Sequence, residues 1–172
     1  MNILPDVLTD GLDVVFCGTA AGKYSAKVGH YYAHPRNRFW KALHDAGFTD
    51  RQISPCDYRD LLNHKIGLTD LIKDKAGPDR EVVNADLEKA RKNLSRKIEK
   101  YQPKVIAFTG KQPAEQFLSR EEFDYGSQEE KIGNTILWVL PSPSSANAHW
   151  DIEEWVQFKL YLGSISEFRK TK

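Results

Sequence analysis

The groups best suited to bind and transform a ligand lie directly after three apolar runs of the sequence. The first run ends in a glycine-bracketed loop, residues 18–22, that reads GTAAG. The second ends at Thr69 and Asp70, and the third at Pro141 and a serine-rich stretch. In an open α/β sheet, ligands bind where parallel strands end. If the three runs are parallel strands, their ends form one site, and Asp70 places a carboxylate in it.

The glycine loop does not match the common nucleotide-binding patterns. A phosphate-binding P-loop has four residues between its glycines and then Lys-Ser or Lys-Thr, whereas Gly18 and Gly22 are separated by three residues and followed by Lys23 and Tyr24. The dinucleotide pattern G-x-G-x-x-G is absent. The five histidines lack the spacing of zinc motifs, and no G-x-S-x-G nucleophile motif occurs. The residues therefore disfavour a nucleotide hydrolase, a metal centre and a serine hydrolase.

Aromatic and basic residues beside the loops have the chemistry that nucleic acids require. Tyr32 offers a ring on which a planar base can stack. Lys23 and Lys111 each lie next to a loop glycine, where an ammonium group can contact a phosphate. The serine-rich stretch after Pro141 can present hydroxyl and N–H groups to phosphates. Each feature also has a plainer interpretation: a core tyrosine, surface lysines and an ordinary turn.

Alternating apolar runs and amphipathic stretches predict the elements that position these residues. Buried strands are expected over residues 12–17, 66–72, 104–109 and 135–140. Helices are expected over residues 35–47, from Ser54 onward, from a cap at Asn84 to Tyr101, over 111–118 and over 152–165. Residues 121–134 are charged and are expected to form turns. This order predicts one α/β domain over residues 1–172, with a parallel sheet covered by helices on both faces.

The composition sets limits on compartment and partners. Lys and Arg total 25 against 24 Asp and Glu, a net charge of +1, so any affinity for nucleic acid has to come from a local patch. Two cysteines, Cys17 in an apolar run and Cys56 in a polar one, suggest thiols in a reducing compartment. Since neither a membrane-spanning run nor a signal pattern is found, we expect a soluble cytoplasmic protein.

Several segments in their order along the chain resemble the mismatch-specific uracil-DNA glycosylase and thymine-DNA glycosylase branch of the uracil-DNA glycosylase superfamily. They are VVFCG at 14–18, YAHPRNRFW at 32–40, AGFTDRQ at 46–52, GLTDL at 67–71, GKQ at 110–112 and WVLPSPS at 138–144. The resemblance implies a three-layer α/β/α fold around a short parallel sheet and no metal or cofactor. It also implies a monomer that acts on DNA containing uracil or a related lesion and hydrolyses the bond between a flipped uracil and deoxyribose.

The resemblance also assigns residues to the site. Tyr32 matches the aromatic that stacks on the flipped base, Thr19 and Ala20 match the loop that lines the base pocket, and residues 142–147 match the loop that enters the duplex. The predicted substrate contacts are Gly18, Thr19, Ala20, Gly22, Ser25, Tyr32 and His34. The predicted DNA contacts are Lys23, Lys111, Ser142, Ser144, Ser145 and Asn147.

Two departures from the family pattern point to Asp70. The family loop is typically Gly-Ile-Asn-Pro-Gly, whose Asn holds the attacking water, and here Ala20 stands in its place. The loop entering the duplex is typically Asn-Pro-Ser-Gly-Leu-Ser-Arg, and here residues 142–148 read SPSSANA, without the large apolar residue or the Arg. Because a methyl group cannot orient water, we hypothesise that Asp70 positions the water and stabilises the cationic sugar.

Other interpretations of these residues stay open. Asp70 can instead cap the following segment or pair with Lys73. The water can instead be held at Ser25 or His34, or catalysis can come mainly from stabilising the leaving base. The chain can also be a damaged-base or DNA-binding module that has lost activity, or a hydrolase of free nucleosides. An Asp70 carboxylate at the mouth of the site favours an enzyme over a binding module.

Overall fold

The computed structural model describes residues 1–78 and 86–170, with side chains to residue 166, and it is built around one five-stranded sheet. The strands are β1 (Val14–Gly18), β2 (Ile66–Asp70), β3 (Val105–Phe108), β4 (Gly126–Ile132) and β5 (Thr135–Val139), in the order β2-β1-β3-β5-β4. All neighbours are parallel except β4 and β5. The predicted α/β architecture is therefore confirmed, and the carboxyl ends of β1, β2, β3 and β5 share one edge.

Strand β4 corrects the prediction that residues 121–134 form only turns. It pairs antiparallel with β5 at the edge of the sheet, and most of its residues are exposed or half-buried. An edge strand with one solvated side needs few apolar residues, so the sequence GSQEEKI has no buried-strand pattern. Its charged side chains explain why the segment resembles a loop.

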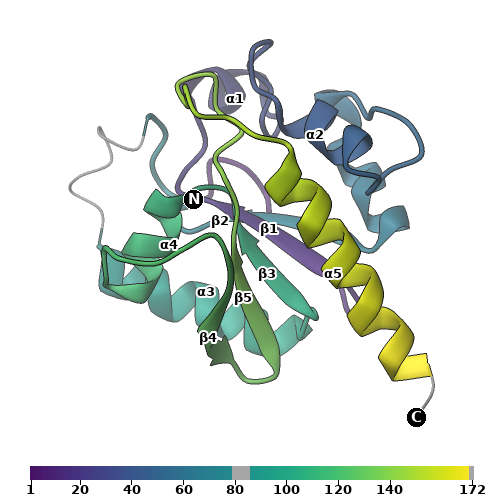
Figure 1. Ribbon diagram of the computed structural model, residues 1–172. Coiled ribbons are helices and arrows are strands. Elements are labelled where there is room, and N and C mark those ends of the chain that lie inside the picture. Colours follow the sequence, from purple (N-terminus) through teal and green to yellow (C-terminus); the bar gives the residue numbers. More distant parts are fainter. Residues whose placement is uncertain (79–85, 171–172) are drawn as a thin grey trace.

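Helices cover both faces of the sheet, which gives the three layers (Figure 1). Phe16 and other alternate strand residues pack with α2 (Phe39–Asp45), the 3-10 helical segment η1 (Pro55–His64) and α5 (Glu153–Lys170). Cys17 and the residues facing the other way pack with α3 (Leu87–Tyr101) and α4 (Lys111–Leu118). Because parallel strands buried on both faces are apolar at nearly every position, the continuous runs located them well.

The helices near the site differ from the predictions. Helix α1 (Lys23–Val28) was not among the expected helices. It is only six residues long and lies between Gly22 and Gly29. Helix α2 begins at Phe39 and not at Pro35, because residues 34–38 form a turn in which the Asn37 N–H donates to the His34 carbonyl. Helix α3 begins at Leu87 with Asp86 as its cap, and the predicted cap Asn84 lies outside the described residues.

The N-terminal segment lies along the outer edge of β2. Val7 and Leu68 exchange backbone hydrogen bonds of 2.9 and 3.0 Å, and the Ile3 N–H donates to the Lys73 carbonyl at 2.7 Å. Leu4 and Val7 are buried in the core beside Phe16. The segment therefore covers a sheet edge that would otherwise present unpaired backbone groups.

Asp6 fixes this segment to the end of β2 and to α3. Its carboxylate lies 2.9 Å from Lys73 Nζ and 2.6 Å from Lys97 Nζ, and it accepts a hydrogen bond of 2.7 Å from the Thr69 hydroxyl. Burial opposes ionisation of Asp6, but the two ammonium groups and the hydroxyl outweigh it and hold the pKa of this carboxyl below its usual value. The network therefore contributes stability as long as Asp6 is ionised.

Replacing Asp6 with Asn should lower the free energy of unfolding at neutral pH by about 2 kcal/mol or more, because two partly buried ammonium groups lose their counter-ion. The pKa of Asp6 is lower in the folded than in the unfolded chain, so this contribution is present above the unfolded value of 3.8 and is lost as the pH falls through the folded value. Urea unfolding at neutral pH and at about pH 3 measures both effects.

The exposed Asp10, on the same segment, provides the control variant Asp10→Asn, which should leave stability unchanged. The interpretation is wrong if Asp6→Asn and Asp10→Asn unfold at the same urea concentration at neutral pH.

Candidate active site

Three polar groups from different strands or loops converge above Gly18. In the parallel register of β1 and β2, Gly18 is the partner of Asp70. A Cβ atom built on Gly18 would lie 2.9 Å from Asp70 Oδ1, 3.3 Å from the Tyr32 hydroxyl oxygen and 3.6 Å from Thr109 Oγ1. The Tyr32 and Thr109 hydroxyls are hydrogen-bonded at 2.9 Å. A side chain at position 18 would therefore force the Asp70 carboxylate to move away from β1.

Asp70 and Tyr32 thus lie together, as predicted, whereas Thr109 was not predicted. Asp70 is only 5% exposed, and it ends its strand two residues before the predicted end at Ile72. Thr109 follows the apolar run of β3 and precedes Gly110, the same strand-then-glycine signal that drew attention to the first loop. Applied to β3, the same pattern would have identified Thr109 as a candidate site residue.

Tyr32 is held in an unusual backbone conformation. Its φ of 49° lies in the left-handed region, which costs a residue other than glycine roughly 1 kcal/mol. The ring stacks on Phe39, with centroids 3.9 Å apart and planes at 17°, and the hydroxyl bonds Thr109. One face of the ring is therefore covered by Phe39, so a base can stack only on the opposite face.

The loop after β1 presents one buried hydroxyl without a partner. Thr19 is 4% exposed, and within the described part of the chain its Oγ1 atom makes no hydrogen bond. Ala20 packs on the core cluster of α3 and α4. An unpaired buried hydroxyl costs about 1–3 kcal/mol, so it is rarely kept without a use. Thr19 therefore brings an unused hydrogen-bonding group next to Gly18.

The other predicted substrate contacts support the loops. Gly22 is the residue that precedes α1, and the Ser25 hydroxyl accepts a hydrogen bond from the Ala33 N–H at 3.0 Å. His34 is exposed, and its Nδ1 atom accepts a hydrogen bond of 3.1 Å from the Arg36 N–H. The Ser25 hydroxyl thus binds the backbone of Ala33, and His34 lies at the surface.

The negative charge of Asp70 acts on its surroundings. Burial raises the pKa of the Cys17 thiol well above its usual value, and the charge of Asp70 adds to the effect. Burial together with the charges of Asp70 and Asp6 likewise raises the pKa of the Tyr31 hydroxyl far above its usual value. Both groups therefore stay protonated and neutral, and Asp70 is the carboxylate that borders Gly18.

The serine-rich loop is closed on itself and is held by Arg38. The Ser142 and Ser144 hydroxyls accept hydrogen bonds from the N–H groups of residues 144 and 146, and the Asn147 amide donates to the Ser142 carbonyl. Arg38 Nη1 donates to the carbonyls of Ser144 at 3.0 Å and Asn147 at 3.2 Å. Ser145 lies at the exposed tip. These side chains shape the loop, and sequence reasoning did not identify Arg38, which is separated from its partners by more than 100 residues.

The two predicted phosphate contacts have different surroundings. Lys23 is exposed at the start of α1. Lys111 Nζ lies 4.9 Å from the ring centre of Tyr125, and it shares a shallow hollow with three carboxylates, those of Glu121, Glu122 and Asp124. An acidic surrounding repels a phosphate, so the geometry favours Lys23 over Lys111 for this role.

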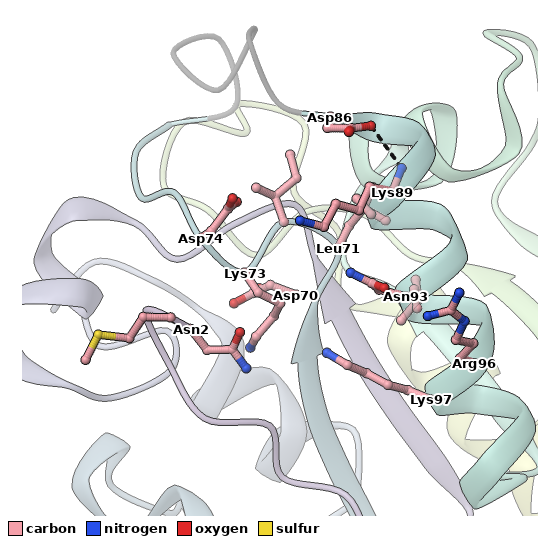
Figure 2. Close-up of a pocket in the computed structure, with 14 residues that line it drawn as sticks. Asn2, Asp70, Leu71, Lys73, Asp74, Asp86, Lys89, Asn93, Arg96 and Lys97 are labelled. Atoms are coloured by element: carbon pink, nitrogen blue, oxygen red, sulfur yellow. Dashed lines mark hydrogen bonds between the residues drawn. The ribbon is translucent and has the colours of Figure 1, made fainter.

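A pocket of about 530 Å³ lies beside Asp70, between the N-terminal segment and α3 (Figure 2). Basic side chains of α3 reach it from one side, and Lys73 lies across from them. The lining basic residues are Lys73, Lys89, Arg96 and Lys97. Asp70 lines this pocket (Figure 2), whereas residues 18–22 and Tyr32 do not, so the pocket meets the Gly18 cluster at Asp70. The spacing of 89, 93, 96 and 97 along one side of a helix could have identified this surface.

Within the described residues, no group of three or more His, Cys, Asp or Glu side chains is placed to hold a metal ion. A search of the same residues finds no helix that is long and apolar enough to cross a bilayer. The polar groups at the strand ends are thus a carboxylate, hydroxyls and backbone amides.

Comparison with known proteins identifies the family and the fold. A family model of the uracil DNA glycosylase superfamily matches residues 5–162. The solution NMR structure of a Methanosarcina acetivorans protein, described as a candidate uracil DNA glycosylase, is similar in fold, with a TM-score of 0.57 and 23% sequence identity. The match covers 93% of this chain and 96% of that one. The chain therefore belongs to the uracil DNA glycosylase superfamily.

Proposed function

We propose that the protein is a monofunctional DNA glycosylase of the mismatch-specific branch, which hydrolyses the N-glycosidic bond of a flipped-out uracil. Uracil opposite guanine is the proposed main substrate, and other deaminated or damaged bases are further candidates. In this role the protein would act as a cytoplasmic monomer that starts base-excision repair. The observation that carries the proposal is the buried Asp70 carboxylate next to Gly18, with the Tyr32 and Thr109 hydroxyls beside it.

The reaction places two demands on the site. As the bond breaks, positive charge develops on the sugar and negative charge on the departing base. In the proposed mechanism, the water oxygen forms a bond to C1′ and the C1′–N bond breaks with its electron pair going to the base. The water proton passes to Asp70, and the products are an abasic site, a protonated Asp70 and the anion of the base. A carboxylate in this position suits both the proton transfer and the cationic sugar.

The base would be held by the groups around Gly18. It would stack on the face of Tyr32 that Phe39 leaves open. The Thr19 hydroxyl, which has no partner in the described structure, would donate to a carbonyl of the base and stabilise its negative charge. Lys23 would contact the DNA backbone, and the loop of residues 142–147 would lie against the duplex.

A catalytically weakened module that only binds damaged DNA is the alternative. It predicts binding to a uracil-containing duplex without release of uracil. The buried carboxylate favours the enzyme, because burying an ion costs several kcal/mol and a binding surface for a polyanion gains nothing from a negative charge.

Replacing Thr19 with Val should slow uracil release without lowering the free energy of unfolding. Val removes an unpaired hydroxyl at nearly constant shape, so the free energy of unfolding should stay the same or rise by about 1 kcal/mol, while uracil release slows. Thr135→Val is the control, because the Thr135 hydroxyl is buried and donates to the Pro103 carbonyl at 2.6 Å, far from the site. It should lower stability by about 1 kcal/mol and leave activity intact. Equal destabilisation of the two variants would show that Thr19 has a structural partner.

Replacing Asp70 with Asn or with Ala should lower the single-turnover rate of uracil release by about 100-fold or more, because a general base and an anionic partner for the sugar are lost. Strand nicking after abasic-site cleavage measures the rate on uracil opposite guanine, opposite adenine and in a single strand. Asp74→Asn is the matched control, since Asp74 is an exposed carboxylate four residues further on. If both Asp70 variants keep the rate within a few-fold of the wild type, Asp70 is not the general base.

The binding of the same duplex by each variant is measured in parallel. A wild-type protein that binds the duplex and releases no uracil would establish the binding module in place of the enzyme.

A further inference from the structure

Tyr24 is an exposed aromatic ring at the rim of the candidate active site. It is the second residue of α1, and 45% of its surface is exposed. Among the described residues, only one other exposed large apolar side chain is aromatic, Tyr125, which directly precedes the outermost strand β4. A single exposed ring is common on protein surfaces, so the surroundings of Tyr24 decide what it can contact.

His34 supports the ring of Tyr24. The two rings meet edge to face, with centroids 5.6 Å apart and planes at 74°. His34 begins the turn of residues 34–38, whose Asn37 N–H donates to the His34 carbonyl at 2.8 Å. This contact holds the Tyr24 ring beside the turn, while 45% of the residue's surface stays exposed to a partner.

The turn connects Tyr24 to the serine-rich loop. Arg38 donates from its backbone N–H to the Pro143 carbonyl at 2.9 Å and from its side chain to Ser144 and Asn147. Figure 1 shows α1 and this loop at the same end of the molecule. At the loop tip, the exposed residues Ser145 and Ala146 are small. The loop can thus approach a duplex, but its tip carries no side chain large enough to fill a gap in a base stack.

The charge of this rim fits a polyanion. From Gly18 to Leu43 the sequence contains five lysines and arginines and no Asp or Glu, and Pro141 to Trp150 contains no acidic residue. Lys41 pairs with Asp45, and Arg38 holds the loop, while Lys27 and Arg36 are exposed. The near-neutral chain therefore carries a basic rim on which Tyr24 is the exposed aromatic ring.

We infer that Tyr24, supported by His34, enters a DNA duplex and stacks in the gap that a flipped nucleotide leaves. This inference rests on the proposed function, because only a protein that takes a base out of a duplex creates such a gap. Apolar side chains that enter a base step stabilise the distorted duplex by replacing the lost stacking. The partner is therefore double-stranded DNA, and a single strand, which has no gap to fill, does not need Tyr24.

The experiment compares Tyr24→Ala and Tyr24→Phe with the wild type. The probe is a duplex with a stable abasic analogue and 2-aminopurine as the neighbouring base, whose fluorescence reports unstacking. Tyr24→Ala should bind this duplex about ten-fold more weakly and lose the fluorescence change, while Tyr24→Phe retains both. Affinity for a single strand of the same sequence should not change. Tyr125→Ala is the matched control, since Tyr125 is 39% exposed at the same end of the sheet but has an acidic surrounding, and it should behave as wild type.

Unchanged duplex affinity of Tyr24→Ala would overturn the inference, as would an equal loss on single and double strands or an equal loss in Tyr125→Ala. This measurement needs no catalysis, so it is independent of the uracil-release assay. A wild type that binds the abasic duplex through Tyr24 but releases no uracil would contradict the proposed enzyme and leave the stacking role intact. A wild type that releases uracil, together with a Tyr24→Ala variant that binds the abasic duplex normally, would support the enzyme and contradict the stacking role of Tyr24.

Discussion

The site depends on the close approach of the Asp70 carboxylate to the backbone of Gly18. Parallel pairing of β1 and β2 makes the two residues partners at the ends of their strands, and an added Cβ would lie 2.9 Å from the carboxylate. Glycine keeps this space open, and the hydroxyls of Tyr32 and Thr109 border it. The carboxylate, the ring and the hydroxyls therefore hold their relative positions because three strands of one sheet end side by side.

The turn of residues 34–38 joins the chemical part of the site to the part that would meet DNA. Next to its C-terminal end, Phe39 stacks on Tyr32 and so fixes the ring that faces Gly18. On its outer side, His34 contacts Tyr24, and Arg38 holds the serine-rich loop. A change in the turn would move all these groups together. The Tyr32 ring, the Tyr24 ring and the serine-rich loop thus all depend on contacts made by residues 34–39.

The sequence predicted the parts of the fold that depend on local patterns. The apolar runs identified β1, β2, β3 and β5, since strands buried on both faces have no polar alternation. Pro35 suggested a helix start, but backbone bonds of the turn to Pro143 and His34 delay it to Phe39. The partners of Tyr32 and Arg38 lie 77 and 106 residues away, at Thr109 and Ser144, so a single sequence gave no reason to pair them. Asp70 was found because strand ends converge, which is a property of the topology.

The distribution of charge decides which part of this edge can face a duplex. Beside β4, Lys111 shares a hollow with the carboxylates of Glu121, Glu122 and Asp124. Burial and the charge of Glu154 raise the pKa of the nearby Tyr125. Phosphates would therefore be repelled on this side. Residues 18–43, which include α1 and the turn, and residues 141–150 of the serine-rich loop contain no Asp or Glu. At physiological salt, surface charges act over only about 8 Å, so these local differences outweigh the overall charge of the chain. A duplex would therefore lie across α1 and the loop with its lesion over Gly18, away from the acidic edge.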